Sequence, residues 1–227
     1  MGNIFDKSAD QYSSIVDDAI KFSNKEQSFF TSIKSQLILK IINRVMPEKE
    51  AEVLDVGCGI GLIHTYLAPR LKRLEAIDSS EASIQQARKT CPDINYQVYD
   101  GGPLPYEDAQ FDFSYTICVM HHVPPNDRQP FLKEMRRTLK PGGTAIIIEH
   151  NPINPVTQYV VRNCELDKDA ILLTSGRCRK ELTRAGFSQC STNYFMFFPY
   201  EGAFFRTLEV GLGWLPMGAQ YICIAKA

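Results

Sequence analysis

The sequence predicts an α/β fold built on a mostly parallel sheet, and two patterns indicate it. Short apolar segments alternate with amphipathic segments from about residue 51 to residue 150, an order typical of parallel strands joined by right-handed helical crossovers. The first apolar segment, residues 53–56, leads into a glycine-dense turn at residues 57–61 and then into a helical pattern. A buried strand, a tight glycine turn and a helix N-terminus together form a cradle for a nucleotide.

Composition limits the classes of function. The chain has 227 residues, 44% hydrophobic and 22% charged, which is ordinary for a globular protein with a full core. A net charge of −1 gives no reason to expect a nucleic acid or an anionic membrane as partner. The first residues lack the apolar core of a signal peptide, and no window approaches the roughly 18 apolar residues of a membrane span. We therefore expect no nucleic-acid partner and no membrane span.

The spacing of the cysteines indicates the redox environment. The chain has seven cysteines, an odd number, and no two are arranged as C-x-x-C. This spacing argues against a disulfide framework and against a zinc site, and it favours a reducing compartment. We therefore expect a cytoplasmic protein without a metal site.

The N-terminal region predicts an addition to the main domain. Residues 1–24 are polar and lack strong periodicity, so we expect a loosely packed segment that could fold over a ligand. Residues 25–46 carry apolar side chains at three- and four-residue steps, which predicts a helix with one apolar face. Pro47 ends it. We expect residues 1–50 to form a helical cap and residues 51–227 to form the main domain.

Within residues 51–150 the alternation predicts five strands and three helices. The predicted strands are residues 51–56, 74–77, 94–99, 111–120 and 144–148, and the predicted helices are residues 62–71, 81–91 and 127–139. Ser79 or Ser80 is suited to cap the second helix. The strand at residues 111–120 is apolar almost throughout, as expected for a strand buried on both faces.

The pattern changes after residue 152. We expect a short helix at residues 156–161, a helix that Ser175 caps and that runs through residue 185 to end at Gly186, and strands at residues 187–200 and 221–225. Eight aromatic residues lie between residues 194 and 214. They could line an apolar acceptor pocket or form a homodimer contact, and ordinary core packing explains most of them equally well.

Five polar segments come at the carboxyl ends of predicted strands. They are Gly57, Asp78, Asp100, residues 118–122 and residues 149–151. In a parallel sheet these ends meet at one edge, where ligands bind near the point at which the strand order reverses. The sequence therefore predicts one ligand site built from distant segments.

The glycine turn has the pattern G-x-G-x-G. A nicotinamide-dinucleotide fold needs G-x-G-x-x-G, and Leu62 occupies the place of the third glycine. A phosphate-binding P-loop is excluded because no Gly-Lys-Ser/Thr follows. The pattern therefore favours a cofactor that has a nucleoside but no phosphates.

The run D-V-G-C-G-I-G at residues 55–61 resembles the first motif of the class I S-adenosylmethionine-dependent methyltransferases. L-P-Y-E-D-A-Q-F-D at residues 104–112 and L-K-P-G-G at residues 139–143 are similar to two further motifs of that family. The resemblance covers residues 51–149 in the correct order. It implies a Rossmann-like seven-stranded sheet, mostly parallel with an antiparallel final strand, and helices on both faces.

The resemblance also implies site residues. S-adenosyl-L-methionine would be the cofactor and S-adenosylhomocysteine the product. Asp78 would hold the two ribose hydroxyls, which a carboxylate can accept together, and Asp100 would meet the adenine amino group. Asp55 would organise the loop near the methionine amino group. The remaining predicted cofactor contacts are Gly57, Cys58, Gly59, Gly61, Ser79, Gly101 and Cys118. Cys58 is more simply a small loop residue than a nucleophile.

Candidates for the chemistry follow the fourth and fifth strands. His121 and His122 stand where family members often carry a histidine or an aromatic residue beside the methyl group, and either could serve as a general base. Glu149, His150 and Asn151 open a polar, proline-rich turn, resembling one in a bacterial subgroup, that suggests acceptor binding. We expect methyl transfer to a small or medium-sized acceptor. The first candidate for the attacked atom is oxygen, followed by nitrogen or carbon.

Two alternatives stay open. The chain could bind the cofactor without catalysis, as a regulatory or structural protein. It could also be a nicotinamide-dependent oxidoreductase, which the glycine pattern disfavours.

Overall fold

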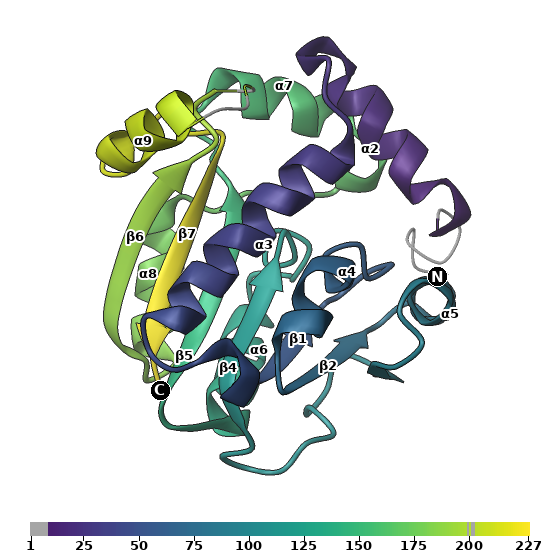
Figure 1. The fold of residues 1–227 in the computed structure, drawn as a ribbon, viewed down its shortest axis with the longest axis vertical. Coiled ribbons are helices and arrows are strands. Elements are labelled where there is room, and N and C mark those ends of the chain that lie inside the picture. The colour runs from purple at the N-terminus through teal and green to yellow at the C-terminus, as the bar shows by residue number, and fades with distance from the viewer. Residues whose placement is uncertain (1–8, 199, 201–202) are drawn as a thin grey trace.

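A seven-stranded sheet forms the centre of the computed structural model, which describes residues 9–198, 200 and 203–227 (Figure 1). The strands are β1 (Glu52–Val56), β2 (Arg73–Asp78), β3 (Asn95–Val98), β4 (Phe111–Ile117), β5 (Leu139–His150), β6 (Ser188–Phe195) and β7 (Gln220–Lys226). Their order is β3-β2-β1-β4-β5-β7-β6. Strands β1 to β5 pair in parallel, whereas β7 runs antiparallel to β5 and β6. This confirms the predicted mostly parallel sheet with an antiparallel final strand.

Strand β1 lies at the point where the strand order reverses. Val53 pairs with Leu74 of β2 on one side and with Phe113 of β4 on the other. Four of its five residues are buried, as expected for a strand covered on both faces. The crevice beyond the carboxyl ends of β1 and β4 is therefore the expected ligand site.

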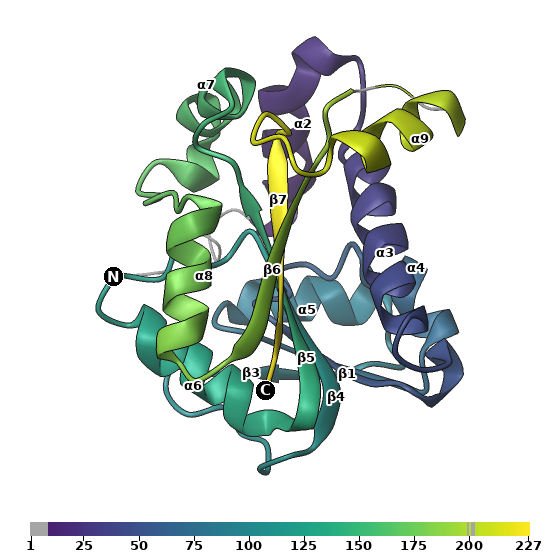
Figure 2. The same ribbon diagram turned by 90° about the vertical axis from the view of Figure 1, so that its left-hand side faces the viewer.

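Helices cover both faces of the sheet, as Figure 2 shows edge-on. On one face lie α3 (Gln27–Asn43), α4 (His64–Leu67) and α5 (Glu81–Thr90), and on the other lie α6 (Arg128–Thr138) and α8 (Ser175–Arg184). Ile38 and Ile42 of α3 belong to the apolar core of the first face, and Leu132 and Leu182 belong to that of the second. Burial of these amphipathic faces, at about 25 cal/mol per Å² of apolar surface, holds the layers together.

Three further helices lie above the carboxyl edge of the sheet in Figure 1. They are α2 (Tyr12–Ile20), α7 (Pro155–Asn163) and α9 (Ala203–Leu212). Ala19 of α2 packs with Cys164 and Leu166, which follow α7, in a separate small core. The 3₁₀ turns are η1 (Ala9–Gln11), η2 (Lys21–Ser23), η3 (Glu48–Glu50), η4 (Ala68–Arg70) and η5 (Glu165–Asp167).

The N-terminal segment is more ordered than we predicted. Residues 1–24 were expected to pack loosely, but α2 is a helix that contacts both α3 and α7. Tertiary packing supplies the stability that the local sequence lacks. Residues 1–8 lie outside the described residues. The predicted division at residue 50 stays a prediction.

Two boundaries at the glycine turn and at β4 differ from the predicted ones. The helix expected at residues 62–71 is α4 followed by η4, because Pro69 has no N–H and its ring would clash with an α-helical carbonyl four residues earlier. The strand expected at residues 111–120 ends at Ile117, because Cys118 adopts a left-handed φ of +56°. This turn directs the chain toward the two histidines that follow.

Later elements also differ. Strand β5 begins at Leu139 rather than at residue 144, because Leu139 pairs with Phe111 across a register shift. Thr174, not Ser175, caps α8 through the N–H of Arg177. Helix α9 was not predicted, and the strand expected at residues 187–200 ends at Phe195. The aromatic residues between residues 194 and 214 have no regular spacing that would distinguish a strand from a helix.

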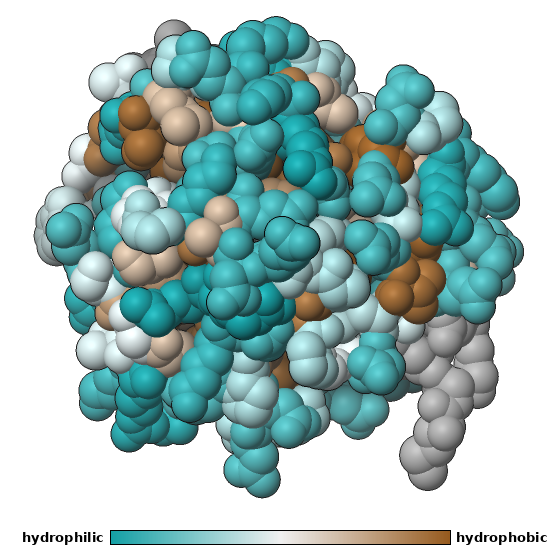
Figure 3. All heavy atoms as spheres, turned by 90° about the horizontal axis from the view of Figure 1, so that it is seen from below, coloured by the Kyte–Doolittle hydropathy of each residue, from teal (hydrophilic) through white to brown (hydrophobic). Residues whose placement is uncertain are grey.

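The surface seen from below, at the amino ends of the parallel strands, is mostly hydrophilic with small separate apolar patches (Figure 3). The predicted site residues lie at the opposite, carboxyl end of the sheet. Among the described residues, no helix has the length and apolar character needed to cross a membrane.

Replacement of Leu54 by Ala should lower the free energy of unfolding by about 2–5 kcal/mol, because the side chain is fully buried in the core and leaves a cavity. The matched control is Val45→Ala, at a side chain that is 51% exposed, which should change stability by less than about 0.5 kcal/mol. Urea denaturation measures both. Equal losses in the two variants would contradict the assigned core.

Candidate functional site

A cavity of about 590 Å³ opens at the carboxyl ends of β1 and β4. Nine of the predicted cofactor contacts line it: Asp55, Gly57, Cys58, Gly59, Asp78, Ser79, Asp100, Gly101 and Cys118. His122 lines it too. The structure thus brings together residues from four strand ends, as expected for this edge of a parallel sheet.

The glycine turn owes its shape to left-handed backbone angles. The φ angles of Gly57 and Gly59 are +83° and +53°. A Cβ on Gly57 would lie 2.5 Å from a methyl carbon of Val119, whereas one on Gly59 would meet nothing within 4 Å. Gly57 therefore allows close packing of the loop, and Gly59 presents open backbone to the cavity, where a ligand can approach.

Gly61 serves the packing of the fold. It does not line the cavity. A Cβ on it would lie 3.0 Å from the Cβ of Ala87 in α5 and 3.0 Å from Nδ1 of His64. Its missing side chain lets α4 and α5 approach, and its contact with the cofactor stays a prediction.

Asp55 and His64 form a buried pair that the sequence did not reveal. Nε2 of His64 lies 2.8 Å from Oδ2 of Asp55, and Nδ1 lies 2.8 Å from the hydroxyl of Tyr96. The pair ties β1 to α4 beneath the glycine turn. A lone histidine in an apolar helical segment gives no sign of such a partner.

Asp78 holds the glycine turn from the end of β2. Its Oδ2 accepts the N–H of Gly59 at 2.7 Å, and its Oδ1 accepts the N–H of Ser80 at 2.9 Å. Burial raises the pKa of Asp78 above its usual range, although these N–H groups oppose the shift. Each carboxylate oxygen keeps a lone pair for a further donor. Two neighbouring hydroxyl groups, such as those of a ribose, fit this arrangement. Asp100 is exposed at the rim.

A second cavity of about 380 Å³ adjoins the first. Seven residues line both cavities: Tyr12, Gln27, Thr31, Lys34, Ile117, Cys118 and His122. Four of them come from α2 and α3, so the N-terminal helices form a shared wall. A ligand in one cavity can therefore meet a ligand in the other.

The second cavity is apolar with a few polar groups. Its apolar walls come from α2, α3, α7, η5 and the segment after β6, and include Val16, Phe30, Val160, Leu166, Met196, Phe197 and Phe198. Gln220 is buried, and its Oε1 has no hydrogen-bond partner among the described residues. Burial and the charge of His121 lower the pKa of His150 to about 4, so this ring is neutral at pH 7. The cavity suits a partly apolar molecule with hydrogen-bonding groups.

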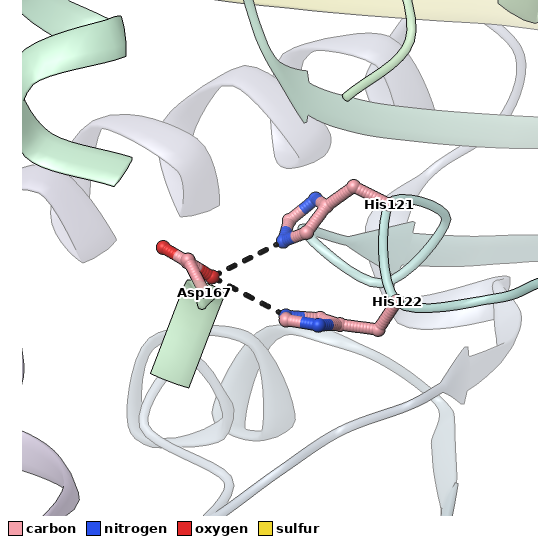
Figure 4. A group of neighbouring side chains, drawn as sticks. All are labelled: His121, His122 and Asp167. Atoms are coloured by element: carbon pink, nitrogen blue, oxygen red, sulfur yellow. Dashed lines mark hydrogen bonds and ion pairs between the residues drawn. The ribbon is translucent and has the colours of Figure 1, made fainter. Parts of the chain in front are cut away.

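Of the two predicted catalytic histidines, His122 lines both cavities and His121 lines neither. Figure 4 shows both rings directed at Asp167. His121 is 1% exposed, with Nδ1 2.5 Å from Oε2 of Glu149. Its Nε2 is 3.4 Å from Oδ1 of Asp167, and Nε2 of His122 is 3.3 Å from the same oxygen. Burial alone would lower the pKa of His121, but the two carboxylates raise it well above its usual range. Asp167 was missed because it lies 45 residues downstream in a turn without a motif.

Of the three predicted acceptor contacts, only His150 lines the second cavity. Glu149 is fully buried, and its Oε1 accepts the N–H of Met120 at 2.7 Å. Asn151 is fully buried and donates to the carbonyls of Pro216 and Gly218. Both side chains hold the walls of the site rather than face its interior.

Comparison with known proteins identifies the domain. Residues 53–143 match the family described as "Methyltransferase domain". An O-methyltransferase from Pyrenophora dematioidea is 29% identical over 161 residues, 67% of this chain and 60% of that protein. A ubiquinone biosynthesis O-methyltransferase from Coxiella burnetii is 35% identical over 109 residues, 46% of each chain. The chain thus spans at most 60% of the length of these two relatives.

Solved structures share the fold over greater length. An S-adenosylmethionine-dependent methyltransferase from Thermotoga maritima matches with a TM-score of 0.70 at 18% identity, covering 100% of this chain and 99% of the other. One from Mesorhizobium loti matches with a TM-score of 0.61 at 21% identity, covering 83% and 96%. At these identities the likeness confirms the predicted fold.

The glycine turn offers a matched pair of substitutions. Gly57→Ala and Gly59→Ala each place a Cβ at a left-handed φ, which costs roughly 1–2 kcal/mol. Gly57→Ala also forces a clash with Val119, which should cost about 1–3 kcal/mol more. Chemical denaturation should therefore show the larger loss of stability for Gly57→Ala. A loss in Gly59→Ala that matches or exceeds it would contradict this account of the turn.

Proposed function

We propose that this chain, a member of the class I S-adenosylmethionine-dependent methyltransferases, methylates a small or medium-sized acceptor. Oxygen is the first candidate for the attacked atom. The observation that carries this proposal is the pair of adjoining cavities with a shared wall. One has the glycine turn and acidic groups suited to a nucleoside, and the other suits an acceptor. A protein that only bound the cofactor would have no need of the second cavity.

The residues present fit the proposed cofactor. Asp78 would accept both ribose hydroxyls, Asp100 at the rim would meet the adenine, and the open backbone at Gly59 would admit the methionine part. When bound, S-adenosylmethionine supplies a methyl group already activated on its sulfonium. The work left to the chain is to hold the acceptor, exclude water and receive a proton.

Lys34 is the cation that we assign to the carboxylate of the methionine part. It is half-buried and lines both cavities. No carboxylate among the described residues forms an ion pair with it. A cation in this position is stabilised by a bound anion, and the methionine end of the cofactor carries one.

The acceptor would occupy the second cavity. Its apolar walls would bury a carbon skeleton, and Oε1 of Gln220 would accept a hydrogen bond from the acceptor, because a buried acceptor atom without a partner is costly. The similar proteins from Pyrenophora and Coxiella are O-methyltransferases, which supports oxygen as the attacked atom. His122 would contact the reacting group, and His121 would position it.

Three further proposals concern the assembly. Residues 1–50 would act as a cap, since α2 and α3 wall both cavities. All seven cysteines are free thiols, which supports a cytoplasmic location. Exposed apolar side chains on and after α9, Val210 and Trp214 foremost, support a homodimer contact there.

Cofactor binding can be tested by thermal shift. S-adenosylhomocysteine should raise the melting temperature of the protein, and NADH should not. Asp78→Asn should weaken binding of S-adenosylhomocysteine at least about tenfold, since one charge-assisted acceptor is lost at a buried site. The control is Asp93→Asn, the same change at an exposed carboxylate outside both cavities. A shift with NADH alone would refute the proposed cofactor.

The two histidines can be tested by turnover. The double variant His121→Ala/His122→Ala should lose about 10²-fold or more of methyl transfer to a panel of phenols, acids and amines, because no group remains to receive the proton or position the acceptor. Its affinity for S-adenosylhomocysteine should persist, which controls for folding. Single His122→Ala, at a half-buried side chain, should show most of the loss. Unchanged turnover in the double variant would refute the role.

A further inference from the structure

Two imidazoles and one carboxylate converge where the two cavities meet. One ligand atom from each of His121, His122 and Asp167 lies within 4.8 Å of the others. Figure 4 shows both rings directed at the same carboxylate oxygen. We propose that these three residues bind a divalent transition-metal ion, with zinc as the ion best suited to them. The cysteine spacing predicts no metal site, but this group contains no cysteine.

The two distances to Asp167 match those of a metal site. Ligand atoms roughly 2.0–2.2 Å from a tetrahedral zinc ion are about 3.4 Å apart. Oδ1 of Asp167 is 3.4 Å from Nε2 of His121 and 3.3 Å from Nε2 of His122. An ion could therefore replace these contacts with little movement of the carboxylate. Two histidines and a carboxylate leave a coordination position open, as in catalytic zinc sites.

Glu149 orients His121 in the manner expected for a metal ligand. It contacts Nδ1 at 2.5 Å, and its other oxygen accepts the N–H of Met120 at 2.7 Å. Histidine ligands of metals usually donate their second nitrogen to a carboxylate, which fixes the ring and its tautomer. Here the fixed nitrogen leaves Nε2 facing Asp167.

A buried arginine holds the two ligand-bearing segments together. Arg128 donates from Nε to the carbonyl of Val123 at 3.0 Å and from Nη2 to the carbonyl of Ile171 at 2.8 Å. The N–H of Ile171 in turn donates to the carbonyl of His121 at 2.8 Å. The positions of the histidines and of Asp167 are thus set by the surrounding fold.

The open position would face the acceptor. His122 lines both cavities, and Asp167 lines the second. With the ion bound, His122 would be its ligand instead of the base: a hydroxyl group on the ion would lose its proton to solvent more readily and would offer its oxygen to the methyl group. This chemical role rests on the proposed function, whereas binding of the ion does not.

The competing arrangement is a metal-free one. With both ring nitrogens protonated, His121 donates to Glu149 and to Asp167, and the group is a hydrogen-bonded cluster. Zinc would have to displace the proton on Nε2. The deciding measurement is therefore the bound metal itself.

The experiment uses full-length protein without a polyhistidine tag, treated with a chelator, dialysed, and titrated with zinc sulfate. We expect one bound zinc per chain by calorimetry and by elemental analysis, and a visible absorption band of tetrahedral type with cobalt(II). Asp167→Asn and His122→Gln should abolish stoichiometric binding. Glu149→Gln should weaken binding by about 10- to 100-fold.

The matched control is Glu165→Gln, which removes an equal charge from the same turn. Glu165 is 68% exposed and pairs with Lys168, so this variant should bind zinc like the wild type. A thermal shift with S-adenosylhomocysteine, measured on every sample, shows that each variant is folded and tests the proposed function separately. No zinc uptake by the wild type, or equal uptake by Asp167→Asn and His122→Gln, would overturn the metal site.

Discussion

The carboxylate of Asp78 is the interaction on which the cofactor cavity depends. It joins the glycine turn, through the N–H of Gly59, to the turn that begins α5, through the N–H of Ser80. The same two oxygens retain the lone pairs that a ribose would use. One buried side chain therefore fixes the shape of the loop and, in the proposed complex, would also bind the ribose.

Buried polar side chains also join different strand ends at other positions along the same edge of the parallel sheet. Cys118 leaves β4 with a left-handed φ and directs His121 and His122 toward the interior, where Glu149 from the end of β5 receives the first of them. Arg128 then fastens the segment that carries Asp167. Polar groups buried in this way must be fully paired, because an unpaired one costs about 1–3 kcal/mol. The pairing holds His121 and the segment that carries Asp167 in place.

The sequence predicts the alternation of strands and helices, the glycine turn and the two acidic strand ends. Hydrophobic periodicity and the position of residues relative to strand ends depend on neighbouring residues in the chain. The second cavity could not be predicted in this way. Its walls come from α2, α3, α7 and residues 196–198, segments that lie far apart in the chain and meet only when the helices pack on the sheet. The sequence did not reveal the roles of His64 and Asp167, because each role depends on a partner side chain that the fold brings close.

By itself the sequence determined the class of fold and the residues that we propose to hold a nucleoside, because a strand, a glycine turn and a following acid lie close together along the chain. The tertiary structure decided that Gly61 packs helices instead of lining the cavity, that Asn151 supports the wall, and that two histidines meet Asp167. These facts depend on contacts between residues far apart in the chain. Such contacts are set by how the helices pack on the sheet, which no local pattern encodes.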